Sequence, residues 1–114
     1  MKTNEVWVYI EQDGGKIADV SLELVSKAAD LAKTLGVKSA GVLIGANVKD
    51  LAVKVFSYGA DKVYLAEDAN LKDYTTLPYS RIVADLIKEY SPQIVLYGAT
   101  ITGRDIAPRI ASEL

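Results

Sequence analysis

The residues best suited to chemistry in this 114-residue chain gather in one segment, residues 98–108. It contains two glycines, two threonine hydroxyls, an Arg-Asp pair and a proline, and it follows the apolar run at residues 94–97. Glycines allow a ligand close to the backbone, and a guanidinium fork binds phosphate oxygens. A helix that begins here would also present free N–H groups and a positive end. The segment is therefore a candidate anion or interface site, with a nucleotide phosphate as the sharpest hypothesis. Its candidate residues are Gly98, Thr100, Thr102, Gly103 and Arg104.

The same segment also has a purely structural interpretation. Thr102 could cap the last helix, with Asp105 completing an arrangement like a capping box. Arg104 could pair with a carboxylate or a partner chain, and Asp105 would repel a phosphate. The chain has neither a Walker-type Gly-Lys-Ser/Thr nor a Gly-x-Gly-x-x-Gly motif. Helix capping and interface contacts are favoured over phosphate binding, and both interpretations stay open.

Two missing residue types remove whole classes of chemistry. The chain has no cysteine and no histidine. It therefore offers no disulfide, no thiolate nucleophile, no Ser-His pair and no imidazole ligand for a metal. Three carboxylates lie in residues 67–74, but the spacing and the glycine of a calcium loop are missing, so we expect a solvated loop and no metal site. We expect no catalytic activity from this chain alone.

Charge and hydropathy exclude further classes. Thirteen basic and fifteen acidic residues give a net charge of -2, which argues against a nucleic-acid or anionic-membrane binder. No apolar run is long enough to span a membrane, so no membrane insertion is expected. The first five residues contain no apolar signal segment. A cytoplasmic location is the expectation.

The elements that must position the segment alternate between strands and helices. Apolar runs predict strands at residues 6–10, 39–44, 63–66 and 93–97. Between them, apolar residues at three- and four-residue spacing predict helices at residues 21–35 and 48–58, and a third that opens at residues 75–78. This order predicts one α/β domain over residues 1–114, an open three-layer α/β/α fold with a mainly parallel, Rossmann-like sheet.

Local signals predict how these elements begin and end. Asp19 or Ser21 is expected to cap the first helix and Asn47 the second. Gly36 and Gly59 are expected to end them. The apolar stripes predicted to face the core are Leu22, Val25, Ala29, Ala32 and Leu35 in the first helix, Leu51, Ala52, Val55 and Phe56 in the second, and Ile82, Val83, Leu86 and Ile87 in the third.

The residues also carry a resemblance to a known family. Stretches at residues 6–11, 19–24, 58–64, 73–75 and 98–109 resemble, in order, the amino-terminal domain of the electron transfer flavoprotein alpha subunit, the FixB-type proteins. The resemblance implies an adenine nucleotide α-hydrolase-like fold that is truncated at Leu114. It also implies a scaffold that docks a beta subunit, within an electron carrier that takes electrons from dehydrogenases.

The family's cofactor is FAD, held chiefly in a carboxyl-terminal domain that this chain lacks. No flavin-contacting motif of the family falls on this sequence, so no FAD is expected on this chain alone. Trp7 and Tyr9 could stack on a flavin, but core or interface packing is favoured. The alternative function is a nucleotide-binding module of the universal stress type, which would bind AMP or ATP at the turn after the fourth strand.

Overall fold

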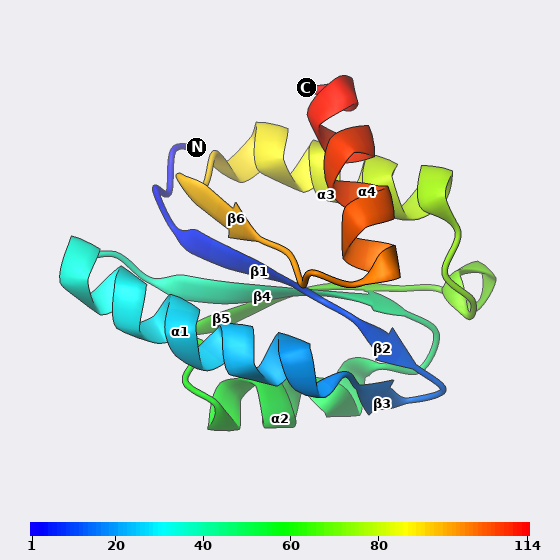
Figure 1. The fold of residues 1–114 in the computed structure, drawn as a ribbon, viewed down its shortest axis with the longest axis horizontal. Coiled ribbons are helices and arrows are strands. Elements are labelled where there is room, and N and C mark those ends of the chain that lie inside the picture. The colour runs from blue at the N-terminus through cyan, green and yellow to red at the C-terminus, as the bar shows by residue number, and fades with distance from the viewer.

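A computed structural model describes residues 1–114 as a four-stranded parallel sheet between two helical layers (Figure 1). The strands lie in the order β5-β4-β1-β6. A small antiparallel hairpin, β2 with β3, follows β1. The strands are β1 Val6–Ile10, β2 Gln12–Asp13, β3 Lys16–Ile17, β4 Ser39–Gly45, β5 Lys62–Glu67 and β6 Ile94–Leu96.

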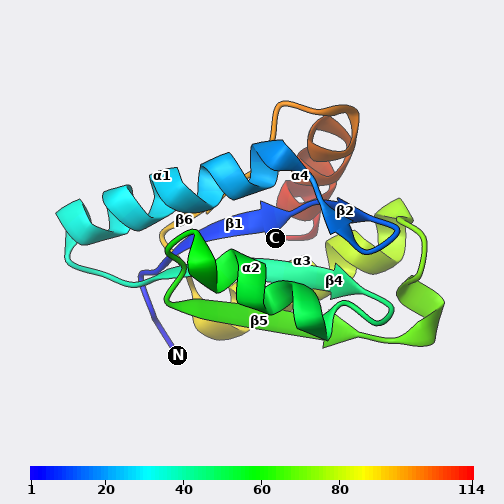
Figure 2. The ribbon, with the colours of Figure 1, turned by 90° about the horizontal axis from the view of Figure 1, so that it is seen from below.

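Helices cover both faces of the sheet, as the alternating pattern predicted. Figure 1 shows α1 and α2 below the sheet and α3 and α4 above it, and Figure 2 shows α1 and α2 in front of the strands. The helices are α1 Asp19–Leu35, α2 Ala52–Ser57, α3 Thr76–Tyr90 and α4 Ile101–Glu113, with short 3₁₀ turns at Lys49–Leu51 and Ala69–Leu71. The open, mainly parallel α/β/α architecture is confirmed.

The central strand β1 explains why the fold has two cores. All five of its residues are buried, and successive side chains of a strand point to opposite faces. Val6, Val8 and Ile10 pack under α1 and α2 in an aliphatic core. Trp7 and Tyr9 pack under α3 and α4 in an aromatic core, so the expectation that they serve in packing is confirmed for both rings.

The first helix begins earlier than predicted and is capped differently. It starts at Asp19, and neither Asp19 nor Ser21 caps it, because the N-cap position is Ala18. Ser21 is buried, and its Oγ accepts the N–H of Glu11 at 2.9 Å, which ties the end of β1 to the helix. Gly36 ends the helix at φ 70°, as predicted.

The predicted apolar stripes are partly wrong. In α1 Ala28 is buried where Ala29 was expected, and Leu35 is exposed. In α3 only Val83 of the expected stripe is fully buried, because the face against the sheet also contains Ala84 and a tyrosine. Leu22, Val25 and Ala32 of α1 are buried as predicted, so its stripe lies on the correct face. The buried face of α3 is turned toward residues 79–84, and Ile82, Leu86 and Ile87 are left half-buried.

The second helical segment is shorter than predicted, since a 3₁₀ turn precedes α2. Asn47 does not cap it, and has φ 55°. The Oε2 atom of Glu67, at the end of β5, instead accepts the N–H groups of Val48 and Lys49 at 2.8 and 2.9 Å. Phe56 is exposed and not inward-facing. A carboxylate that is distant in sequence therefore accepts the N–H groups that a local cap was expected to bind.

Candidate functional site

The sheet order places a topological switch point at the carboxyl end of β1. From β1 the chain moves to β4 on one side, and it later crosses to β6 on the other side. In open α/β sheets ligands bind outside the carboxyl ends of the strands at such a switch point. At this point a cleft of about 400 Å³ opens beside the end of β1 and the β2–β3 hairpin.

The turn that leads into α4 is held by contacts within the chain. Thr100 is the N-cap, and its Oγ1 accepts the N–H of Gly103 at 2.9 Å. The same hydroxyl lies 2.8 Å from both carboxylate oxygens of Glu11, to which it donates. A Cβ atom on Gly103 would overlap the carbonyl oxygen of Gly98. The glycines therefore bring parts of this chain together.

The predicted capping box at this helix is wrong. The helix begins at Ile101, with Thr100 and not Thr102 as its cap. Asp105 instead accepts the hydroxyls of Tyr74 at 2.7 Å and Thr76 at 2.5 Å. These hydrogen bonds lower the pKa of Asp105 from its ordinary value, because they favour the ionised form. Asp105 thus joins α4 to the start of α3.

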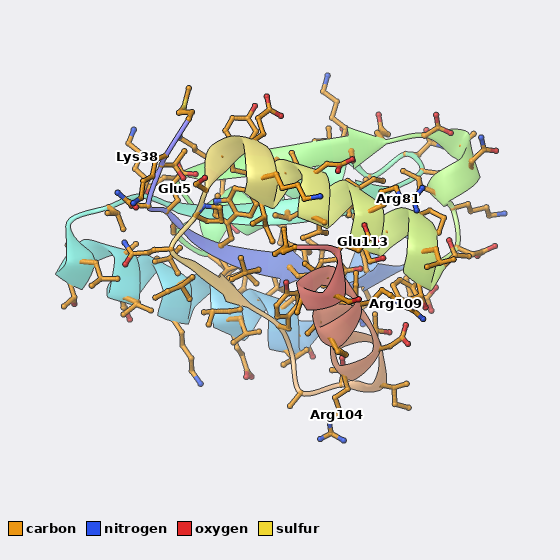
Figure 3. All side chains as sticks on the ribbon, turned by 90° about the horizontal axis from the view of Figure 1, so that it is seen from above. Glu5, Lys38, Arg81, Arg104, Arg109 and Glu113 are labelled. Atoms are coloured by element: carbon orange, nitrogen blue, oxygen red, sulfur yellow. The ribbon has the colours of Figure 1, made fainter.

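Arg104 lies apart from the cleft. It is exposed, makes no ion pair, and points away from the body of the protein in Figure 3. Gly98 is buried against Glu11, where a Cβ atom would meet Oε2 at 2.7 Å. Of the five predicted residues only Thr102 lines the cleft. The structure therefore does not gather the five around one ligand position.

Apart from Thr102, the cleft is lined by residues that lie outside the predicted anion or interface segment. Its walls combine tyrosine rings and isoleucines with three carboxylates and one lysine. The lining residues are Tyr9, Ile10, Glu11, Gln12, Asp13, Lys16, Ile17, Ala18, Asp19, Ile44, Tyr74, Tyr79 and Thr102. The position of Glu11 directly after a buried strand was the available signal for this site.

The three cleft tyrosines differ in how their hydroxyls are used. Tyr74 donates to Asp105, and Tyr79 donates to the carbonyl of Leu71 at 2.5 Å. Burial is the main cause that raises the pKa of all three, with Tyr74 at about 12. The nearby tyrosines and the Glu11 carboxylate raise the pKa of Tyr9 further. All three phenols are therefore neutral at physiological pH.

A second polar cluster lies at the amino end of the same strand. Glu5 is only 3% exposed, and it accepts the Trp7 indole N–H at 3.1 Å and the Tyr64 hydroxyl at 2.7 Å. Lys62 Nζ lies 2.6 Å from its other oxygen. Burial raises the pKa of Glu5, but the bonds from Lys62, Tyr64 and Trp7 outweigh burial and lower it overall. Each side chain of this cluster has a partner within it, so we interpret the cluster as structural.

Other candidate sites find no geometric support. No three acidic residues of the chain converge as metal ligands. Glu67 and Asp68 instead accept backbone N–H groups at the starts of the two 3₁₀ turns. None of the helices has the length and apolar character that crossing a membrane requires.

Comparison with known proteins identifies relatives of the whole chain. The family described as "Electron transfer flavoprotein domain" matches residues 6–114. An electron transfer flavoprotein subunit alpha of Thermoanaerobacterium thermosaccharolyticum is 46% identical over 96% of this chain, which covers 33% of that relative. A FixB protein of Clostridium saccharobutylicum is 44% identical, and an acryloyl-CoA reductase electron transfer subunit beta of Anaerotignum propionicum is 40% identical, each over 96% of this chain. The chain spans about a third of the length of these relatives.

A solved structure shares the fold. A universal stress protein from Archaeoglobus fulgidus aligns with a TM-score of 0.59 over 96% of this chain and 91% of its own. The two sequences are 16% identical. At that identity the likeness supports the Rossmann-like architecture and says nothing of a shared ligand.

Proposed function

This chain belongs to the electron transfer flavoprotein family, and we propose that it is the amino-terminal domain of an alpha subunit. The observation that carries the proposal is the 46% identity to an alpha subunit over 96% of the chain. Its role is to form a scaffold and to dock a beta subunit in an FAD-containing carrier that takes electrons from dehydrogenases. It performs no catalysis itself, and we place it in the cytoplasm.

The turn into α4 supplies a docking surface of suitable chemistry. Ile101, the first residue of the helix, is 90% exposed, and the unpaired Arg104 extends from the next turn. An exposed apolar residue beside an arginine is typical of interface anchors. Because Thr100, Gly98 and Gly103 hold the turn from inside, Ile101 and Arg104 are presented on a rigid support.

The cleft at the carboxyl ends of the strands does not suit FAD. The diphosphate of FAD is anionic, whereas the cleft presents Glu11, Asp13 and Asp19 against the single cation Lys16. Arg104, the cation best suited to phosphate, does not line the cleft. These charges support a division in which FAD is held by another part of the full-length protein. They equally disfavour the alternative of an AMP- or ATP-binding module.

The first experiment combines a visible spectrum with a binding measurement. We expect the purified chain to be colourless, and to bind a beta subunit of the family in calorimetry. Ile101→Asp and Arg104→Ala should each weaken that binding without changing stability. Val53→Asp is the matched control, because Val53 is 72% exposed on α2, across the sheet from the turn.

Three results would contradict the proposal. Flavin absorption near one equivalent per chain would show that the chain forms its own flavin site. A beta subunit that binds all variants equally would remove the α4 turn from the interface, and no binding at all would remove the docking role.

A further inference from the structure

One hydroxyl in the cleft has no partner within the protein. Tyr9 is 2% exposed, yet its hydroxyl makes no hydrogen bond, while those of Tyr74 and Tyr79 are both used. With no partner in the protein, both the O–H donor and the oxygen acceptor of this hydroxyl are available to a ligand. Tyr9 lines the cleft, so a ligand there can reach it.

The polar groups around this hydroxyl are mostly hydrogen-bond acceptors. Glu11 receives only the hydroxyl of Thr100, which leaves acceptor capacity on both carboxylate oxygens. Asp13 and Asp19 make no side-chain ion pair. Among the lining residues only Lys16 is cationic, and it is exposed on the hairpin. The cleft therefore favours a ligand that is rich in donors and positively charged.

The apolar and aromatic part of the lining specifies the shape of that ligand. Tyrosine rings and isoleucines make up much of the wall, and the rings of Tyr74 and Tyr79 lie 5.1 Å apart, edge to face. A guanidinium is flat, stacks on aromatic faces and carries five donors, whereas an ammonium is compact and strongly hydrated. The guanidinium fits both the shape and the charge of the cleft.

We propose that the cleft between the end of β1, the β2–β3 hairpin and the start of α4 binds a guanidinium group. Tyr9 accepts one of its N–H groups, Glu11 provides the opposite charge, and the tyrosine rings stack on its plane. The group belongs either to a small molecule or to an arginine of another protein. This site is separate from the exposed Ile101 and Arg104, so the proposal stands independently of beta-subunit docking.

Four probes test the chemistry by NMR titration of the labelled chain. Phenylguanidine represents a free guanidinium compound, and N-acetyl-arginine amide represents a protein side chain. Phenylurea has the same flat shape without the charge, and AMP is the anionic competitor. We expect one or both guanidinium probes to shift the amide signals of Ile17, Ile44 and Thr102, and phenylurea and AMP to leave them unchanged. Which guanidinium probe binds more tightly distinguishes the two sources.

Variants connect the binding to the named side chains. Tyr9→Phe removes the free hydroxyl and no protein hydrogen bond, so the fold is kept and the dissociation constant should rise about tenfold. Glu11→Gln should weaken binding by at least as much. Tyr97→Phe is the matched control, because Tyr97 is half-buried beside Tyr9 but does not line the cleft.

Three outcomes would overturn the proposal. In the first, neither guanidinium probe shifts the cleft signals up to its solubility limit. In the second, phenylurea or AMP binds as tightly as the guanidinium probes do. In the third, the Tyr9→Phe variant binds phenylguanidine as tightly as the parent chain does.

Discussion

Two glutamates at the opposite ends of β1 have contrasting surroundings. Glu5, before the strand, is buried and receives bonds from an indole, a phenol and an ammonium group. Glu11, after the strand, receives one hydroxyl and faces a cleft. At the amino end of β1 the carboxylate is thus paired with side chains of the protein, whereas at the carboxyl end the oxygens of Glu11 can still accept hydrogen bonds.

This difference separates a stabilising cluster from a binding site. A buried carboxylate stabilises a fold only when its partners satisfy it, as the partners of Glu5 do. Free acceptors beside an unpartnered phenol contribute little to folding and remain available to a ligand. Substitutions at the amino end should therefore change stability, and those at the open carboxyl-end groups should change binding.

The largest expected effect comes from Glu5→Ala. Removing the carboxylate leaves the buried Trp7 N–H without an acceptor and Lys62 without its counter-charge. We expect the free energy of unfolding to fall by about 3 kcal/mol. Urea denaturation measures it, and Glu23→Ala, on the exposed face of α1, is the control. Equal, small losses in both variants would mean that the cluster is not stabilising.

The second largest effect tests whether the turn into α4, at the carboxyl end of the sheet, is rigid. Gly103→Ala places a methyl group against the carbonyl of Gly98, so the turn must open. We expect a loss of about 2 kcal/mol in unfolding free energy, measured by the same urea titration. Ser112→Ala, at an exposed position of the same helix, should change little. An unchanged stability for Gly103→Ala would show that the contact between the glycines is loose.

Local periodicity was enough to predict the layers of this fold. The apolar run at β1 and the helix-ending Gly36 each act through their immediate neighbours, and the structure confirms both predictions. The cap predicted at Asn47 failed because a remote residue replaces it: Glu67 caps the segment at Val48 from another strand. Periodicity also cannot fix where the sheet meets a helix, so the buried face of α3 differs from the predicted stripe, whereas most of the α1 stripe is buried as predicted.

The site was harder to predict for the same reason. The segment at residues 98–108 was singled out correctly as a special turn, but its glycines and Thr100 serve internal contacts. Glu5 and Tyr9 are surrounded by residues that are distant in sequence: Tyr64 bonds to Glu5, and Tyr79 packs in the same core as Tyr9. A single sequence does not contain those pairings.

Acidification should lower the free energy of unfolding through Glu5, at the amino end of β1. Because the pKa of Glu5 in the folded chain lies below its ordinary value of 4.5, the folded state holds this proton less tightly than the unfolded chain does. Its stabilisation is present above pH 4.5 and is lost as pH falls through the folded-state pKa. Urea midpoints measured from pH 7 to pH 3 should show this loss, with a smaller slope in Glu5→Gln. Parallel slopes would assign the loss to other carboxylates.

The smallest effect distinguishes a cleft hydroxyl that makes a hydrogen bond within the protein from one that makes none. Tyr79→Phe deprives the Leu71 carbonyl of its donor, so unfolding should become easier by about 1 kcal/mol. Tyr9→Phe removes a hydroxyl that has no partner, so the stability should stay the same or rise slightly. Both rings line the same cleft and remain in place, so paired urea titrations isolate the hydroxyl itself. A loss for Tyr9→Phe equal to that for Tyr79→Phe would mean that Tyr9 already has a partner, and the carboxyl end would then be as closed as the amino end.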